Sequence, residues 1–201
     1  MRTERLSAER ECDLERAADL LREGRIVAFP TETVYGLGAR ADRPDAVAEL
    51  HRVKRRPSGK RFAQLVASTR QAEELARFDE RARALASAFW PGPLTLVLPD
   101  GKGGDVGLRC PDHPVTARLL ESVGVPIAAP SANLSGEPAG TKAEDVLRSF
   151  GGQIAAVLDG GAVTIGESST VVRLTGAEME VLRVGAIREA RLREALLQAG
   201  L

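Results

Sequence analysis

Basic side chains are concentrated in one short segment, residues 54–61 (KRRPSGKR), which carries five cations in eight residues. A run of this kind often marks the solvated C-terminal end of a helix, where positive charge is favourable. The proline and the glycine within it stiffen the loop, so it could also direct cations toward a phosphate chain. The segment therefore predicts either a solvated helix end or a contact with an anionic ligand.

Hydroxyl side chains are concentrated in residues 29–38 (FPTETVYGLG), where Thr31, Thr33 and Tyr35 alternate with other residues ahead of two glycines. The glycines allow tight backbone turns, and the hydroxyls can donate hydrogen bonds to a ligand. A strand-to-helix turn with a capping threonine explains the same pattern about equally well.

Arg109 lies within an apolar run, residues 106–110, that is typical of a buried strand. An unpaired guanidinium is costly in such a place. Arg109 therefore needs a buried carboxylate or an anionic ligand, and both alternatives remain open at this point.

Three further turns combine small, hydroxyl and basic residues at the ends of expected strands: residues 127–136 (IAAPSANLSG), 168–170 (SST) and 182–185 (LRVG). Backbone amides in such turns can bind anions, and ligand sites on α/β sheets usually lie at the ends of the strands. The Trp-Pro-Gly-Pro stretch at 90–93, in contrast, is more typical of a packed structural corner. We interpret His113, which precedes an expected helix, as structural rather than catalytic.

Several familiar sites are absent from the sequence. It contains no GxxxxGK[ST], GxGxxG, GxSxG or HExxH motif, and its two cysteines and two histidines lack zinc-ligand spacing. A site rich in cations and hydroxyls therefore suits an anionic substrate, and we expect no protein-bound transition metal.

Composition favours a folded globular protein over a disordered or membrane-embedded one. The 201 residues are 43% hydrophobic and 28% charged, with a formal net charge of zero, which argues against a general polyanion-binding protein. The charged N-terminus is unlike a signal peptide, and no apolar run approaches the roughly 20 residues that cross a bilayer. We expect a soluble, cytoplasmic protein with no membrane partner.

Hydrophobic periodicity predicts interleaved helices and strands. The expected helices are 9–22, 45–53, 70–76, 80–89, 115–122, 142–149 and 187–198, and the expected strands are 25–30, 62–66, 94–98, 106–110, 127–129, 154–158, 170–174 and 180–184. Residues 94–110 and 170–184 are typical of antiparallel hairpins. The sequence thus predicts one α/β domain, residues 1–201, with helices flanking a twisted sheet of mixed parallel and antiparallel strands.

The ordered set of loops resembles the YrdC/TsaC family of threonylcarbamoyl-AMP synthases. The matching pieces are FPTETVYGLGARA, KRRP, WPGPLTLVL, GLRCPDHP, PIAAPSANLSGEP, SSTVVRLTG and LRVGAI, which extend from about residue 26 to residue 187. The resemblance implies a mixed α/β sheet around a large, concave, positively charged cleft, in the short single-domain form of the family.

Family membership implies a nucleotidyltransferase that joins L-threonine, bicarbonate and ATP, with Mg²⁺ accompanying ATP, into threonylcarbamoyl-adenylate and pyrophosphate. A separate transferase would then modify an adenosine of tRNA. The residues implied for threonine are Thr33, Arg109, the backbone of Ala129 and Ser169, with Thr31 and Tyr35 nearby. Those implied for ATP are Lys54, Arg56, Lys60, Ser131, Asn133 and Arg183, of which Lys54 and Arg56 would be catalytic.

The sequence departs from the family pattern at a few positions. Longer relatives have an asparagine and a histidine where this chain has Lys60 and Leu65, and Ala139 and Arg173 are also unusual. These changes affect the detailed threonine and ATP contacts more than the reaction class.

Two other functions are compatible with such a domain. One is a factor for ribosome maturation that binds double-stranded RNA or tRNA in the cationic cleft, although the lack of an aromatic stacking motif weighs against it. The other is a carbamoyl-transferring domain like those within hydrogenase-maturation enzymes, which normally occur in much longer chains.

Overall fold

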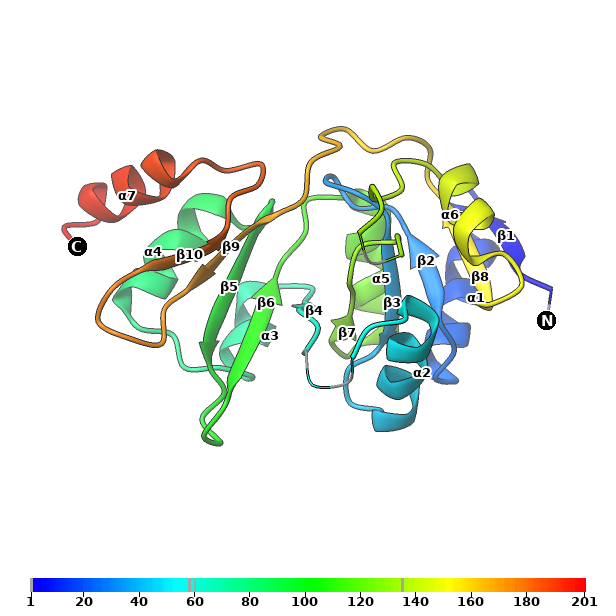
Figure 1. The fold of residues 1–201 in the computed structure, drawn as a ribbon, viewed down its shortest axis with the longest axis horizontal. Coiled ribbons are helices and arrows are strands. Elements are labelled where there is room, and N and C mark those ends of the chain that lie inside the picture. The colour runs from blue at the N-terminus through cyan, green and yellow to red at the C-terminus, as the bar shows by residue number, and fades with distance from the viewer. Residues whose placement is uncertain (1, 58, 60, 135) are drawn as a thin grey trace.

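Short strands of two to six residues form one mixed sheet that extends across the molecule from β1 to β10 (Figure 1). The computed structural model describes residues 2–57, 59, 61–134 and 136–201. Within these residues the strand order is β1-β8-β2-β3-β7-β4-β6-β5-β9-β10. The strands are β1 (Glu4–Ser7), β2 (Val27–Phe29), β3 (Gly36–Arg40), β4 (Gln64–Leu65), β5 (Leu94–Pro99), β6 (Asp105–Arg109), β7 (Ile127–Ala128), β8 (Ala156–Asp159), β9 (Thr170–Arg173) and β10 (Glu180–Arg183).

The pairing of the strands confirms the predicted mixed sheet. Both predicted hairpins are present, because β5 pairs with β6 and β9 pairs with β10 in antiparallel fashion. Parallel pairs join β1 to β8, β2 to β8, β4 to β6 and β5 to β9. The parallel pairing of β5 with β9 places the two hairpins side by side.

The helices lie close to their predicted positions. They are α1 (Glu11–Arg22), α2 (Pro44–Lys54), α3 (Thr69–Glu73), α4 (Glu80–Phe89), α5 (Pro114–Val123), α6 (Ala143–Phe150) and α7 (Glu189–Gln198). Figure 1 shows α4 and α7 at the end of the sheet near β9, and α1 and α6 near β1 and β8. Among the described residues, no helix is both long and apolar enough to span a membrane.

Both faces of the central strands are buried, and alternate residues point to opposite faces. In β2, Val27 and Phe29 belong to the apolar cluster that includes residues of α1 and α5. Ala28 lies between them and belongs to the cluster on the other face, with residues of α2 and α6. The central strands are therefore covered by helices on both sides. Because both faces of these strands are occupied, a ligand site must be formed by the loops at their ends.

Two strands were not predicted. β3 follows the hydroxyl-rich loop and pairs with β2 in antiparallel fashion, so the interpretation of residues 29–38 as a strand-to-helix turn is wrong. The two glycines of β3 are typical of a turn, which is why the sequence did not indicate a strand. In the structure, Gly38 is needed because a Cβ there would come within 2.4 Å of the Phe29 ring. β1 was hidden by the charged residues around Leu6, which is its buried residue.

The Trp-Pro-Gly-Pro stretch forms a packed corner between α4 and β5, as predicted. The Trp90 indole is buried against Phe78 in an edge-to-face arrangement, with ring centroids 6.1 Å apart. Its N–H donates a hydrogen bond to the carbonyl oxygen of Leu94 at 2.7 Å.

Candidate active site

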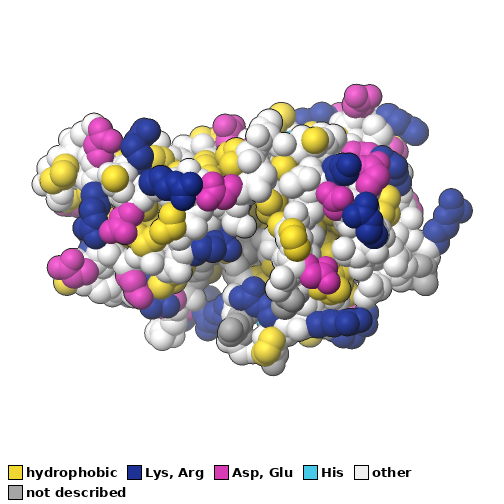
Figure 2. Space-filling model, turned by 45° about the horizontal axis from the view of Figure 1, so that its top comes forward, with side chains coloured by type: hydrophobic (Ala, Val, Ile, Leu, Met, Phe, Trp, Pro, Cys, Tyr) yellow, Lys and Arg dark blue, Asp and Glu magenta, His cyan; other side chains and the backbone are white. Residues whose placement is uncertain are grey.

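A cavity of about 460 Å³ lies where the loops after several strands meet. Figure 2 shows basic side chains around a hollow near the middle of this face of the molecule. The sequence-predicted residues that line the cavity are Thr31, Thr33, Tyr35, Arg56, Arg109, Ala129, Ser131, Ser169 and Arg183. The structure therefore brings together residues that are up to 152 positions apart in the sequence, from Thr31 to Arg183.

Arg109 at the end of β6 has a buried carboxylate partner, which resolves the alternative left open by the sequence. Its Nη2 lies 2.7 Å from Oε1 of Glu32, and both side chains are almost fully buried. The guanidinium also donates from Nε to the carbonyl oxygen of Gly92 at 3.2 Å and from Nη2 to Oγ1 of Thr33 at 2.9 Å. Sequence reasoning missed Glu32, although it is the only acidic residue between Glu23 and Asp42.

The two threonines of the β2–β3 loop form a directional chain of hydrogen bonds. Oγ1 of Thr31 donates to the carbonyl oxygen of Val34 at 2.7 Å and lies 2.8 Å from Oγ1 of Thr33. Because a hydroxyl has only one proton, Thr33 must be the donor to Thr31. Thr33 thus accepts from Arg109 and donates to Thr31, which fixes the orientation of its hydroxyl.

Arg183 is held against Ser169 at another wall of the cavity. Its Nε and Nη2 donate to the carbonyl oxygen of Ser169 at 3.0 and 2.8 Å. Burial, followed by the neighbouring charges of Arg109 and Arg56, lowers the pKa of Arg183. An anion in the cavity would offset this repulsion.

Thr95 is a second site residue that sequence reasoning missed. It is buried, lines the cavity and has its Oγ1 2.9 Å from Oγ of Ser169. Thr95 is the second residue of the apolar strand β5, so the sequence pattern is that of an ordinary core residue.

The end of α2 directs Arg56 into the cavity wall. Arg55 adopts a left-handed conformation with φ of 50°, and the Arg56 amide donates to the carbonyl oxygen of His51 at 3.0 Å. The Arg56 guanidinium carbon lies 5.0 Å from the ring centroid of Phe62, which stacks on His51. Its buried Nε has no hydrogen-bond acceptor among the described residues, so this donor is available to a ligand.

Lys54 lies next to the cavity and is not one of the residues that line it. Its Nζ is 2.6 Å from the carbonyl oxygens of Ser131 and Asn133 and 3.2 Å from Oδ1 of Asn133. Burial and the charge of Arg56 lower its pKa to about 8. Lys54 and Asn133 therefore hold the loop that presents Ser131, while Lys60 lies outside the described residues.

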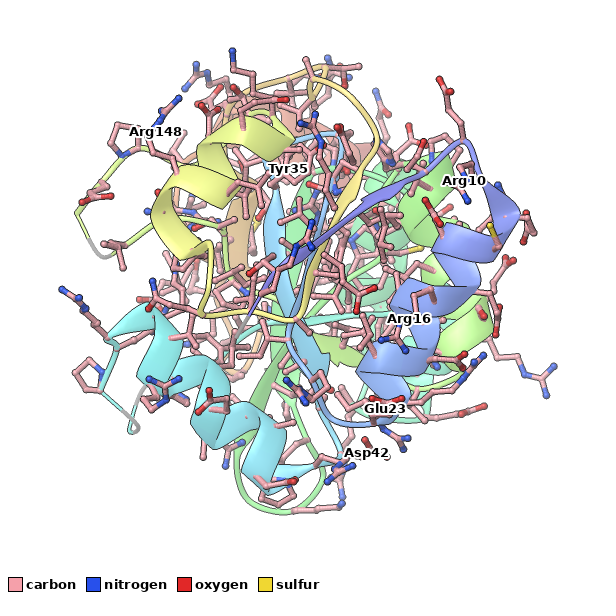
Figure 3. The ribbon with its side chains drawn as sticks, turned by 90° about the vertical axis from the view of Figure 1, so that its right-hand side faces the viewer. Arg10, Arg16, Glu23, Tyr35, Asp42 and Arg148 are labelled. Carbon is pink, nitrogen blue, oxygen red and sulfur yellow. The ribbon has the colours of Figure 1, made fainter. Side chains whose placement is uncertain are left out.

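Tyr35 is among the lining residues, but its hydroxyl is bonded to a segment, Gly160 and Gly161, that does not line the cavity. It donates to the carbonyl oxygen of Gly161 at 2.8 Å and accepts from the amide of Gly160 at 3.3 Å. Tyr35 is fully buried, whereas Figure 3 shows Arg10 and Arg148 at the periphery of the molecule. Burial raises the pKa of Tyr35 to about 12, so the hydroxyl stays neutral and anchors the segment that follows β8.

The positive charge of the cavity is unevenly distributed. Arg109 is paired with Glu32, and two further lining arginines have carboxylate partners in the pairs Arg61–Asp100 and Arg173–Glu180. Arg56 and Arg183 have no carboxylate partner among the described residues. A cleft that is cationic throughout stays a prediction, and the uncompensated charge lies on these two side chains.

The departures from the family pattern also lie in this region. Leu65 and Arg173 line the cavity, whereas Ala139 does not. The part of the chain that the structure describes contains no group of three or more His, Cys, Asp or Glu residues that could hold a metal ion.

Comparison with known proteins identifies the family. The Sua5/YciO/YrdC family model, described as telomere recombination, matches residues 19–185. The curated threonylcarbamoyl-AMP synthase of Bacillus subtilis is 44% identical over 88% of this chain and 54% of its own length. The threonylcarbamoyl-AMP synthase of Pyrococcus abyssi is 46% identical over 85% of this chain and 53% of its own length. The chain thus spans about half the length of these curated relatives.

A solved structure agrees with this assignment. The crystal structure of P. abyssi Sua5 complexed with L-threonine superposes with a TM-score of 0.91 and is 40% identical, covering 98% of this chain and 61% of that one. This chain therefore belongs to the Sua5/YciO/YrdC family.

Proposed function

We propose that the chain is a nucleotidyltransferase that condenses L-threonine, bicarbonate and ATP into threonylcarbamoyl-adenylate and pyrophosphate. One observation carries the proposal: a single cavity is lined by a buried arginine with hydroxyl neighbours and also by two arginines without carboxylate partners. The buried arginine with its hydroxyl neighbours suits an amino acid, and the two arginines without carboxylate partners suit a phosphate chain. The names of the curated relatives support the same reaction.

L-Threonine would bind at Arg109. Nη1 of Arg109 has no hydrogen-bond acceptor among the described residues, so it can donate to the carboxylate of the amino acid. The hydroxyls of Thr33 and Ser169 and the backbone of Ala129 line the same cavity and would contact the remaining polar groups. The complex of P. abyssi Sua5 with L-threonine supports this choice of amino acid.

ATP would bind at the wall formed by Arg56, Arg183 and Ser131. Two guanidiniums that have no carboxylate partner can each form paired, charge-assisted hydrogen bonds to phosphate oxygens. Lys54 and Asn133 would act by holding the loop that carries Ser131. Mg²⁺ would enter as a ligand of the ATP phosphates.

The reaction would proceed in two bond-forming steps. The threonine amine attacks the carbon of bicarbonate and forms the C–N bond of a carbamate. The C–O bond to the departing hydroxyl breaks, and one amine proton joins that hydroxyl, which leaves as water. A carbamate oxygen then attacks the α-phosphorus of ATP, and the bond from that phosphorus to the departing pyrophosphate breaks. Negative charge grows on the phosphoryl oxygens, where Arg56 and Arg183 would stabilise it. Binding the reactants together in one cavity lowers the entropic part of the barrier.

The adenylate would pass to a separate transferase that modifies tRNA, which is the partner that the family implies. Binding of tRNA or double-stranded RNA to the cavity is the alternative function. Nothing in the described residues favours that alternative over the synthase.

The test is product formation by the purified chain. We expect pyrophosphate and threonylcarbamoyl-adenylate, measured by mass spectrometry, when ATP, Mg²⁺, bicarbonate and L-threonine are all present. Omitting threonine or bicarbonate should abolish both products. Pyrophosphate release that needs neither would contradict the proposal, and a salt-sensitive affinity for RNA without turnover would favour the alternative.

A further inference from the structure

We infer that Glu32 is a positioning residue for the amino-acid substrate, because its carboxylate fixes the guanidinium of Arg109 in the cavity wall. This inference rests on the proposed function. Glu32 is 5% exposed and Arg109 is 7% exposed, and the atoms that join them are 2.7 Å apart. Glu32 does not line the cavity, so it would act on the substrate only through Arg109.

The contacts of Arg109 leave one nitrogen available for a ligand. Nε donates to Gly92 and Nη2 donates to Thr33, while the charge of Nη2 lies against Glu32. The contact with Glu32 is an ion pair, because neither carboxylate oxygen accepts a well-aligned hydrogen bond from a described residue. Nη1 therefore remains for a carboxylate in the cavity.

The backbone of Glu32 is held by the segment that follows β8. Its carbonyl oxygen accepts from the amide of Ile165 at 2.9 Å and from Oγ1 of Thr164 at 3.3 Å. The carbonyl oxygen of the adjacent Thr33 accepts from the amide of Gly166 at 2.9 Å. Both partners of Arg109 on this loop are thus fixed by one neighbouring segment.

The ion pair also supplies the counter-charge of the buried Arg109 guanidinium. An arginine in so buried a position needs a counter-charge, and Glu32 supplies it before any substrate binds. Without Glu32 the guanidinium would keep only its hydrogen bonds to Gly92 and Thr33, and its orientation in the cavity wall would be less fixed. With Glu32 in place, Arg109 offers one fixed donor edge that suits the carboxylate of an amino acid.

The test replaces Glu32 by its neutral isostere. In steady-state assays of pyrophosphate release, we expect Glu32→Gln to raise the KM for L-threonine about tenfold or more, because the partner of a buried charge is lost. The KM for ATP should stay within about twofold of the wild-type value, since the phosphate contacts are untouched. Glu49→Gln is the matched control, because it removes the exposed ion pair with Arg52.

Calorimetric titration with L-threonine alone measures the same loss without turnover, and circular dichroism checks that the variant is folded. An unchanged threonine KM in folded Glu32→Gln would overturn the inference and leave the proposed function intact. Equal increases in the KM values for threonine and ATP would also overturn it, because a general disturbance of the site would then be the cause.

If Glu32→Gln does not fold, Glu32→Asp provides the test, because it keeps the charge but withdraws the carboxylate from Arg109. A raised threonine KM with an unchanged ATP KM would support the inference, and unchanged values for both would overturn it. No threonine-dependent release of pyrophosphate by the wild-type protein would overturn the proposed function, and this inference with it.

Discussion

Nζ of Lys54 lies 2.6 Å from the carbonyl oxygen of Ser131, and this contact joins the end of α2 to the loop after β7. Lys54 as a whole is 4% exposed. Its ammonium group also contacts the carbonyl oxygen and Oδ1 of Asn133 in the same loop. Lys54 therefore holds the loop that carries the lining residue Ser131 without lining the cavity itself.

Removing the charge of Lys54 should loosen that wall. We expect Lys54→Met to lower the free energy of unfolding by about 2 kcal/mol, because hydrogen bonds from a charged group are lost. The KM for ATP should rise about tenfold, which corresponds to about 1.4 kcal/mol. Denaturant titration and steady-state kinetics measure the two effects, with the exposed Lys142→Met as the control. Unchanged stability and ATP KM would show that the contact has no such role.

The helices and most strands could be predicted because their hydrophobic periodicity is strong. β3 could not, since its two glycines signal a turn, and only the tertiary packing of Phe29 explains Gly38. β1 could not be predicted, because one buried residue among charged neighbours produces no alternating hydrophobic pattern. Each missed strand depends on a partner that is distant in the sequence or on a ring packed across it.

The loops that line the cavity could be predicted from their residue types, but the contacts between their side chains could not. Hydroxyl and basic residues at strand ends indicated which loops would meet. The partner of Arg109 depends on how β6 lies beside the β2–β3 loop, which no local pattern encodes. Thr95 has the same explanation, since a threonine within an apolar strand becomes recognisable only when Ser169 is placed beside it.

Arg56 should contribute to ATP binding far more than to stability. Because its Nε has no acceptor among the described residues, Arg56→Gln removes only the contact with Phe62, worth about 0.5–1 kcal/mol. We expect the ATP KM to rise about tenfold to a hundredfold, as for the loss of a charged hydrogen bond. Arg52→Gln, on the exposed face of the preceding helix α2, should leave ATP kinetics unchanged. Similar ATP kinetics in both variants would contradict this placement of the phosphates.

Tyr35 should make the stability of the fold depend on alkaline pH. Its pKa is raised from 10.0 to about 12 in the folded chain, so the folded state holds the proton longer than the unfolded state. The stability that Tyr35 contributes is complete below pH 10 and is lost as the pH rises toward 12.

Tyr35→Phe isolates this effect from other groups that titrate in alkali. We expect it to cost about 1 kcal/mol near neutral pH, because the bonds to Gly160 and Gly161 are lost. The difference in free energy of unfolding between the wild type and the variant should shrink as the pH rises above about 10. A difference that stays constant with pH would contradict the assignment.

Arg55 ends α2 in a conformation that favours glycine. With φ of 50° and ψ of 40°, it is the single non-glycine residue with positive φ in the described part of the chain. Arg55→Gly should raise the free energy of unfolding by about 1 kcal/mol, because the left-handed conformation is costly for a residue with a Cβ. Arg55→Ala keeps that cost, so urea denaturation should show no increase in its free energy of unfolding. Equal effects of the two substitutions would show that the backbone conformation is not the cause.

The most direct measurement is a crystal structure of this chain with intact threonylcarbamoyl-adenylate. A single molecule should occupy the cavity, with its threonine carboxylate at Nη1 of Arg109 and its phosphate oxygens at Arg56 and Arg183. Binding of the adenylate on another face, or in the cavity with both ends away from these arginines, would contradict the account.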